Sequence, residues 1–196
     1  MKAFSLVLAS GSRYRAELLG RLGLPFESWA PAVDESPLPH ESCTETAGRL
    51  ARLKAEAALR RFPGAWVIGS DQVAELDGRP LGKPGSRENA RAQLRSMRGR
   101  DVVFHTGLCL LANGRVHEAM VPTHVAFRDL TDAEIERYLD REPAFDCAGS
   151  AKSEGLVPPE ELGVRNEEIN VGDEIAVYVV DNGGRSGNII LSKKKA

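Results

Sequence analysis

The sequence predicts an α/β or α+β domain built around a twisted mixed sheet that is flanked by helices. Helical and strand patterns alternate along the chain, without an internal repeat or a low-complexity tract. A near-continuous apolar run at residues 4–9 is typical of a strand covered on both faces. With 196 residues, 42% of them apolar and 28% charged, the chain can bury the core of one domain and carry a small appendage.

The first third of the chain contains two strand–helix patterns separated by a loop. The expected elements are a strand at 4–9, a helix at 12–22, a loop at 31–42, a helix at 43–62 and a strand at 65–69. Ser12 is suited to cap the first helix and Gly23 to end it. Pro, Ser and acidic residues predict the loop. Thr44 or Thr46 is expected to cap the second helix.

Strand patterns dominate the middle of the chain. The expected elements are a hairpin at 73–81, a helix at 86–98, strands at 101–106, 107–111 and 116–127, and a helix at 131–139. The turns at Asp77-Gly78 and Asn113-Gly114 use dipeptides that favour positive φ. Ser86 is expected to cap the third helix, and Thr131 with Glu134 to form a capping box on the fourth.

Composition excludes several classes of protein. With 26 basic and 28 acidic residues, the net charge of −2 does not fit a polybasic nucleic-acid coat or a disordered chain. No apolar run approaches the length of a membrane span, and the opening run is too short for a secretory signal. Cys43, Cys109 and Cys147 lie too far apart for a zinc motif and indicate a reducing compartment. We therefore expect a cytoplasmic protein without membrane contact.

Three cationic residues and one serine stand in distinctive places. Ser12 and Arg15 open the first helix, where free backbone N–H groups and the helix dipole favour an anion such as phosphate. Lys54 lies in the second helix, and Lys83 lies in a tight Gly-Lys-Pro loop. From residue type alone, each cation is more often a solvated surface charge, and Ser12 more often a simple helix cap.

Acidic residues supply the candidate catalytic and metal-binding groups. Asp71 follows a predicted buried strand, at the edge where open α/β sheets place their ligands. It would either coordinate a divalent cation or activate a water, and the alternative is a structural turn cap. Glu35, next to Asp34 in the Pro-rich loop, would add an oxygen ligand. Neither a zinc-hydrolase motif nor a serine-esterase elbow is present.

Seven motifs together resemble a known family. They occur in the order LASGSRYRAELLGRLGLPFE, AVDESPLP, RLARLKAEAA, VIGSDQV, GKP, HTGL and CAGSAKSEGL. Over about residues 1–156 this set resembles the Maf family of nucleotide pyrophosphatases. The resemblance implies an elongated twisted mixed sheet with a central cleft. It also implies hydrolysis of the α,β-phosphoanhydride of a nucleoside triphosphate with Mg²⁺ or Mn²⁺. Because family members often dimerise, a homodimer is compatible with it.

The resemblance also implies roles for single residues. Asp71 matches the proton acceptor of the family, and the positions that face phosphate are matched by Ser12, Arg15, Lys54 and Lys83. The positions that separate substrates within the family are matched by Tyr14, Gln72 and Glu154. Tyr, Gln and Glu in these places imply 7-methyl-GTP as the substrate, whereas Arg, Thr and Gln would imply dTTP or UTP, which remain the alternative.

Two aromatic residues are candidates for contact with the base. Tyr14 or Trp29 would stack on a cationic methylated base, which the face of an aromatic ring attracts. Arg13 stands where the family commonly has Pro, and this replacement changes the stiffness of the first loop.

The resemblance ends near Leu156, so the sequence predicts a Maf-like domain at 1–156 and a different segment at 157–196. The family's closing strand and helix are absent. The segment instead resembles the second half of an OB-fold RNA-binding repeat of a ribosomal small-subunit protein, and a β-hairpin is expected at 174–180 and 188–191. RNA binding is not expected, because the first strands of such a repeat are missing. A catalytically impaired nucleotide- or RNA-binding chimera is the alternative function.

Overall fold

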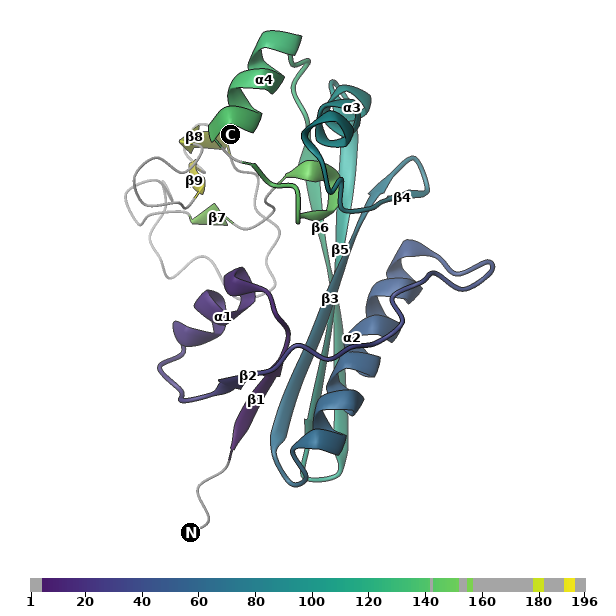
Figure 1. Cartoon of the computed structure of the whole chain (residues 1–196), viewed down its shortest axis with the longest axis vertical. Helices are drawn as coiled ribbons and strands as arrows, with labels where there is room; N and C mark the ends of the chain where they lie inside the picture. The colour runs from purple at the N-terminus through teal and green to yellow at the C-terminus, as the bar shows by residue number, and fades with distance from the viewer. Residues whose placement is uncertain (1–4, 142, 152–154, 157–177, 182–188, 193–196) are drawn as a thin grey trace. The chain divides into compact units, whose positions relative to one another are not determined.

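The computed structural model describes residues 5–141, 143–151, 155–156, 178–181 and 189–192, and it divides the chain into two compact units. The first unit is Met1–Ala151 and the second is Lys152–Ala196. The first unit is a mixed sheet of six strands with helices packed on it (Figure 1). Among the described residues, no helix combines the length and the apolar composition needed to cross a bilayer.

Three long strands lie side by side in the sheet. The strands are β1 Leu6–Ala9, β2 Glu27–Ser28, β3 Trp66–Leu76, β4 Arg79–Leu81, β5 Asp101–Ala112 and β6 Arg115–Ala126. Their order is β2-β1-β3-β5-β6, with β4 paired to β3. β1 runs parallel to β2 and β3, whereas β3 pairs antiparallel with β4 and β5, and β5 pairs antiparallel with β6. The predicted mixed sheet is therefore confirmed.

Two strands are longer than predicted, because each joins two predicted segments. β3 joins the strand predicted at 65–69 to the start of the hairpin predicted at 73–81, and β5 joins the strands predicted at 101–106 and 107–111. β3 continues without interruption through Ser70, Asp71 and Gln72, which pair with Leu108, Gly107 and Thr106 of β5. The polar residues break the apolar pattern of the strand, but the backbone ladder does not depend on side-chain type. Asp71 consequently lies inside a strand rather than after one. The hairpin turn at Asp77-Gly78 and the Asn113-Gly114 turn are confirmed, each with two positive φ angles.

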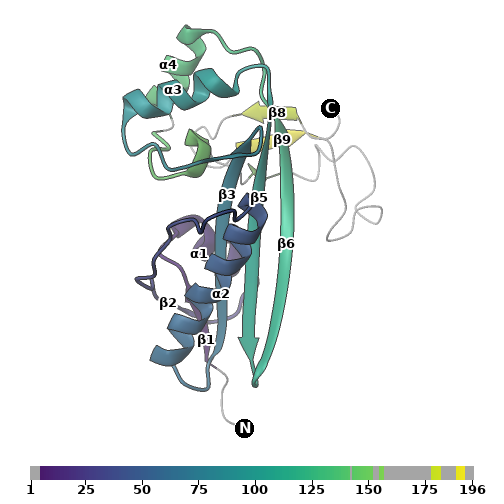
Figure 2. The same cartoon turned by 90° about the vertical axis from the view of Figure 1, so that its right-hand side faces the viewer.

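The helices lie at two ends of the long strands. They are α1 Arg13–Gly20, α2 Cys43–Arg61, α3 Arg87–Met97, α4 Asp132–Arg141 and the short 3₁₀ helix η1 Ala148–Ser150. Figure 2 shows α2 beside one half of the long strands and α3 and α4 beside the other half. On β5, Cys109 and Leu111 belong to the core cluster under α2, whereas Val102 and Phe104 belong to the cluster under α3 and α4. Because side chains alternate along a strand, the two helix layers cover opposite faces.

The N-caps of the helices agree with prediction except at α2. Ser12, Ser86 and Thr131 accept hydrogen bonds from the first turns of α1, α3 and α4. For α2 the predicted cap at Thr44 or Thr46 is wrong. Ser42 caps this helix, because its side chain accepts from the Glu45 N–H while the Glu45 carboxylate accepts from the Ser42 N–H. Helix α1 ends at Gly20, so the prediction that Gly23 ends it is wrong, and none of its residues is buried.

Helix α2 lies very close to the sheet. Its sheet-facing residues are small, with Ala47, Ala51, Ala55 and Ala58 completely buried. A Cβ atom at Gly69 of β3 would lie 2.1 Å from the Ala51 carbonyl oxygen, and one at Gly107 of β5 would lie 2.4 Å from that of Ala47. Only glycine permits this approach of backbone to backbone. The contact fixes where α2 carries its other side chains.

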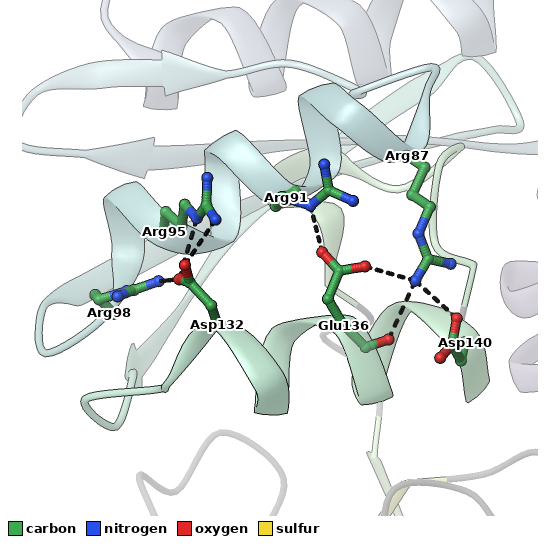
Figure 3. A network of polar contacts seen from close by, with 7 residues as sticks. All are labelled: Arg87, Arg91, Arg95, Arg98, Asp132, Glu136 and Asp140. Carbon is green, nitrogen blue, oxygen red and sulfur yellow. Dashed lines mark hydrogen bonds and ion pairs between the residues drawn. The ribbon is translucent and has the colours of Figure 1, made fainter.

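A row of ion pairs joins α3 to α4 (Figure 3). Arg87 contacts both Glu136 and Asp140 at 2.7 Å, Arg95 contacts Asp132 at 2.7 Å, and Arg91 and Arg98 contact Glu136 and Asp132 respectively. These side chains are partly exposed, so the pairs align two helices whose packing rests on the apolar core between them.

The second unit contains a small sheet of three strands. They are β7 Gly155–Leu156, β8 Tyr178–Asp181 and β9 Ile189–Ser192, in the order β7-β9-β8. β8 and β9 are antiparallel, which agrees with the predicted hairpin, and β7 is parallel to β9. The predicted strand residues 174–177 and 188 lie outside the described residues.

Candidate active site

The centre of the candidate site is a lysine between two carboxylates. The Nζ atom of Lys54 lies 2.6 Å from Oδ1 of Asp71 and 2.6 Å from Oε1 of Glu35. The three side chains come from α2, from β3 and from the loop of residues 30–41, which we name the acidic loop. Segments that are distant in sequence thus bring one cation and two anions together.

Lys54 takes this position because of its place on α2. It lies four residues after the buried Leu50 and between Ala51 and Ala55, which contact the sheet, so its side chain starts on the sheet-facing side of the helix. The side chain is 10% exposed and that of Asp71 is 13% exposed. A buried ammonium is stable only with an acceptor, and Asp71 supplies one at the middle of β3.

Arg15 contacts the strand residue that precedes Asp71. Its Nη1 atom donates to the backbone carbonyl of Ser70 at 3.0 Å and to the Ser10 hydroxyl at 3.4 Å. Ser12 accepts from the Arg15 N–H at 3.4 Å, while its own N–H donates to Ser10 at 3.1 Å. The first turn of α1 and the guanidinium are therefore held beside the strand residue that precedes Asp71.

The pKa of Glu35 is influenced by all three predicted cations. Partial burial acts to raise the pKa of Glu35, but the hydrogen bond from Lys54 and the charges of Lys54, Lys83 and Arg15 outweigh it. The pKa of Glu35 therefore lies below its ordinary value, so this carboxylate is ionised at neutral pH. The effect on one carboxylate places Arg15, Lys54 and Lys83 within electrostatic range of the same point.

The loop that carries Lys83 is held from both sides. The Gly82 carbonyl accepts from Gln93 Nε2 at 2.9 Å, and the Pro84 carbonyl accepts from Asn89 Nδ2 at 2.9 Å. Both donors lie on α3. Lys83 itself is exposed, as a residue that meets a soluble anion must be.

The predicted specificity residues lie next to the site in the chain. Gln72 follows Asp71 and donates from Nε2 to Thr106 Oγ1 on β5 at 2.8 Å. The hydroxyl of Tyr14 accepts from Arg13 at 2.7 Å, and the Arg13 guanidinium lies 4.8 Å from the centre of the tyrosine ring. Glu154 lies outside the described residues.

The structure gives Trp29 a packing role. Its ring meets that of Phe62 edge-on, with centroids 6.0 Å apart, and both rings pack against the core cluster under α2. A ring held in this way contributes to the core. Of the two aromatic candidates, Tyr14 is the one that adjoins Arg15 and the first loop.

Two residues beside the site were not predicted. Arg49 of α2 and Glu41 of the acidic loop form an ion pair with an Nε to Oε1 distance of 2.5 Å. Nothing in their local sequence marks them, because the pair joins a loop to a helix and no spacing rule connects the two positions. The only local signal is that Glu41 precedes the capping serine of α2.

The carboxylates fit the divalent metal that the resemblance implies. Asp71 and Glu35 each direct one oxygen at the point now taken by the Lys54 ammonium. Mg²⁺ prefers such hard oxygen ligands and commonly takes one or two carboxylates together with phosphate oxygens and water. In the described part of the chain, no group of three or more His, Cys, Asp or Glu side chains is arranged to hold a metal. The remaining ligands would therefore come from substrate and water.

Comparison with known proteins identifies the family. Residues 5–159 match the family model described as Maf-like protein. The 7-methyl-GTP pyrophosphatase of Xanthomonas oryzae pv. oryzae is 58% identical over 151 residues, covering 77% of this chain and 80% of that protein. A protein of the same name from Thiobacillus denitrificans is 59% identical, over 78% and 77%. Among solved structures, a HAM1 protein from Coxiella burnetii aligns with a TM-score of 0.49 at 18% identity, over 65% of this chain and 75% of that chain. The family match spans more than half of the sequence, and the chain therefore belongs to the Maf-like protein family.

Proposed function

We propose that this protein hydrolyses the α,β-phosphoanhydride of 7-methyl-GTP and releases 7-methyl-GMP and pyrophosphate. Relatives 58% and 59% identical to it are named 7-methyl-GTP pyrophosphatase, and at this level of kinship the enzyme class, a nucleotide pyrophosphatase, carries over. The structural observation that best supports this proposal is the contact of Lys54 with both Asp71 and Glu35 at 2.6 Å.

The cations supply what this reaction needs most. A triphosphate brings several negative charges, and displacement at phosphorus depends on charge neutralisation and on alignment of the attacking water. The charges of Lys54, Lys83 and Arg15 all lower the pKa of Glu35, so an anion at that point is attracted by all three. We assign them to the phosphate oxygens, together with Ser12 and the N–H groups that open α1.

Asp71 is the group that we assign to the attacking water. Its Oδ1 atom is held by Lys54, and its position in the middle of β3 is fixed by backbone pairing with Gly107 on β5. A carboxylate held in this way can orient a water and accept its proton. Asp71 and Glu35 would hold a divalent metal, which would neutralise charge on the triphosphate. Glu35 is ionised at neutral pH, as that role requires.

The base preference is assigned to Tyr14, Gln72 and Glu154. A methylated guanine is cationic, and the face of Tyr14 attracts a cation. The Arg13 guanidinium already lies 4.8 Å from the centre of that ring, so a nucleotide base and Arg13 would share this aromatic surface. Gln72 is turned to Thr106 by its hydrogen bond, which sets the direction of its amide.

A hydrolysis assay tests the proposal. Pyrophosphate release is measured with 7-methyl-GTP, GTP, dTTP and UTP, with Mg²⁺, with Mn²⁺ and with a chelator, beside the variant Asp71→Asn. We expect fastest turnover of 7-methyl-GTP, dependence on the metal, and a loss of about 10² to 10⁴ in kcat for Asp71→Asn. Preference for dTTP or UTP would overturn the base assignment alone. Nucleotide binding without turnover would overturn the enzymatic proposal and indicate a binding protein.

A further inference from the structure

The carboxylate of Glu41 accepts hydrogen bonds from three different residues. It accepts from the Leu38 N–H at 3.0 Å, from the Thr46 hydroxyl at 3.0 Å, and from Nε and Nη2 of Arg49 at 2.5 and 2.8 Å. The Glu41 side chain is only 9% exposed. A carboxylate with a two-point contact to arginine has one preferred geometry, and this geometry fixes the end of the acidic loop on α2.

Arg49 also reaches the other part of the loop. Its Nη2 atom donates to the Ser36 carbonyl at 3.0 Å, and the Ser36 N–H in turn donates to Asp34 Oδ1 at 2.9 Å. Ser36 directly follows Glu35 in the chain. One guanidinium therefore contacts the loop both beside Glu35 and at Glu41, so the segment between these contacts has little freedom to move along α2.

The contact between Glu35 and Lys54 is too weak to hold the loop by itself. The Glu35 side chain is 49% exposed, and an ion pair with one partner so exposed contributes little in water. The Glu41–Arg49 pair is more buried and is joined by backbone and hydroxyl donors. Because the Glu41–Arg49 pair is the stronger of the two contacts, it fixes the loop, and Glu35 reaches Lys54 as a consequence.

We infer that Arg49 and Glu41 are positioning residues, which hold the acidic loop on α2 so that the carboxylate of Glu35 stays at the Lys54–Asp71 site. The inference rests on the proposed function for its catalytic consequence. Neither residue contacts the reacting atoms, and each acts through Glu35.

Hydrogen exchange tests the placement of the loop without any substrate. Arg49→Met removes the contacts with Ser36 and Glu41. Arg52→Met is the matched control, since Arg52 lies on the same helix and pairs with Glu56 at 2.9 Å and with Glu118 at 3.6 Å, away from the loop. We expect exchange at residues 33–41 to rise at least tenfold in Arg49→Met and to stay unchanged in Arg52→Met and in β3. Unchanged exchange in Arg49→Met overturns the inference.

A double-mutant cycle with Glu35→Gln tests the catalytic consequence. If Arg49 acts through Glu35, Arg49→Met lowers kcat roughly tenfold in the wild-type background and less than twofold in the Glu35→Gln background, because coupled sites are not additive. Arg49→Lys, which keeps the charge and one contact, should recover part of the loss. Equal losses in both backgrounds would show that Arg49 serves the fold in general, and they overturn the inference.

The hydrogen-exchange experiment and the double-mutant cycle together distinguish a failure of this inference from a failure of the proposed function. Absence of turnover in the wild-type protein rejects the function, whereas the exchange experiment still decides whether the Glu41–Arg49 pair holds the loop. Turnover in the wild type with additive losses rejects the inference and leaves the function in place.

Discussion

At the scale of single residues, Lys54 balances the charge of the site. Its ammonium meets two carboxylates at equal distances, and the arrangement is nearly buried on the side of Asp71. Two carboxylates this close to one point repel each other, and the attraction of a cation between them offsets that repulsion. Lys54 thereby stabilises the approach of Asp71 and Glu35 to one point.

Arg13 should weaken the binding of a cationic base. Its guanidinium lies over the ring of Tyr14 and carries the same charge as a methylated guanine. We expect Arg13→Ala to lower KM for 7-methyl-GTP by about two- to fivefold, the range of an exposed cation–π contact, and to leave kcat unchanged. Steady-state kinetics with 7-methyl-GTP, and with dTTP as the comparison whose base is uncharged, measure the effect. An equal change for both nucleotides would contradict a role at the base.

The residues of the site differ in how far the sequence predicts them. Asp71, Lys54 and Arg15 belong to motifs whose order along the chain is informative, and the structure brings them together. The Glu41–Arg49 pair belongs to no motif and is visible only once the loop is folded against α2. Trp29 has the residue type of a base-stacking group, but its contact with Phe62 depends on tertiary packing that composition does not reveal.

At the scale of elements, the approach of α2 to the sheet determines where Lys54 meets Asp71. Gly69 and Gly107 allow the helix backbone to touch β3 and β5. The sequence predicts both elements, but it does not predict that glycines in two strands face the same helix. The polar run from Ser70 to Gln72 likewise conceals the continuity of β3, because hydrophobic periodicity detects burial and not backbone pairing.

A methyl group at Gly107 should push α2 away from the sheet. The new Cβ would lie 2.4 Å from the Ala47 carbonyl oxygen and cannot be accommodated without a backbone shift. We expect Gly107→Ala to lower the free energy of unfolding by about 1–3 kcal/mol, as overpacking does, and to reduce kcat because Lys54 moves with the helix. Urea denaturation and the hydrolysis assay measure the two effects.

Gly20→Ala is the control for this substitution. No atom outside its immediate surroundings lies within 4 Å of a Cβ at Gly20, and the residue ends α1. We expect this variant to unfold at the same urea concentration as the wild type or slightly later. If Gly107→Ala were as stable as Gly20→Ala, the close approach of α2 would not be a constraint on the fold.

At the scale of the whole molecule, the predicted site residues that the structure describes all lie in the first unit. The family match reaches residue 159, eight residues beyond the end of that unit. Sequence motifs predict the family well because they mark the site, whereas in the second unit the strand pattern predicts the hairpin formed by β8 and β9. Charge arithmetic, in contrast, gives only the net value and does not reveal which acidic residues are paired.

Three paired acids should make the stability of the protein fall at low pH. Hydrogen bonds from Arg49, Arg95 and Arg91 lower the pKa values of Glu41, Asp132 and Glu136, each to about 2 (the last two acids are drawn in Figure 3). Each folded pKa lies below the value of the unfolded chain, so these groups stabilise the fold fully above about pH 4.5, and this contribution is lost as the pH falls toward 2.

We therefore expect a thermal midpoint that these groups leave constant from pH 8 to 5 and that drops steeply between pH 4.5 and 2. Circular dichroism at a series of pH values measures it. Glu136→Gln should make the decline shallower, whereas Glu88→Gln, at an exposed acid of α3, should not. A decline of equal steepness in both variants would mean that the acid sensitivity arises elsewhere in the chain.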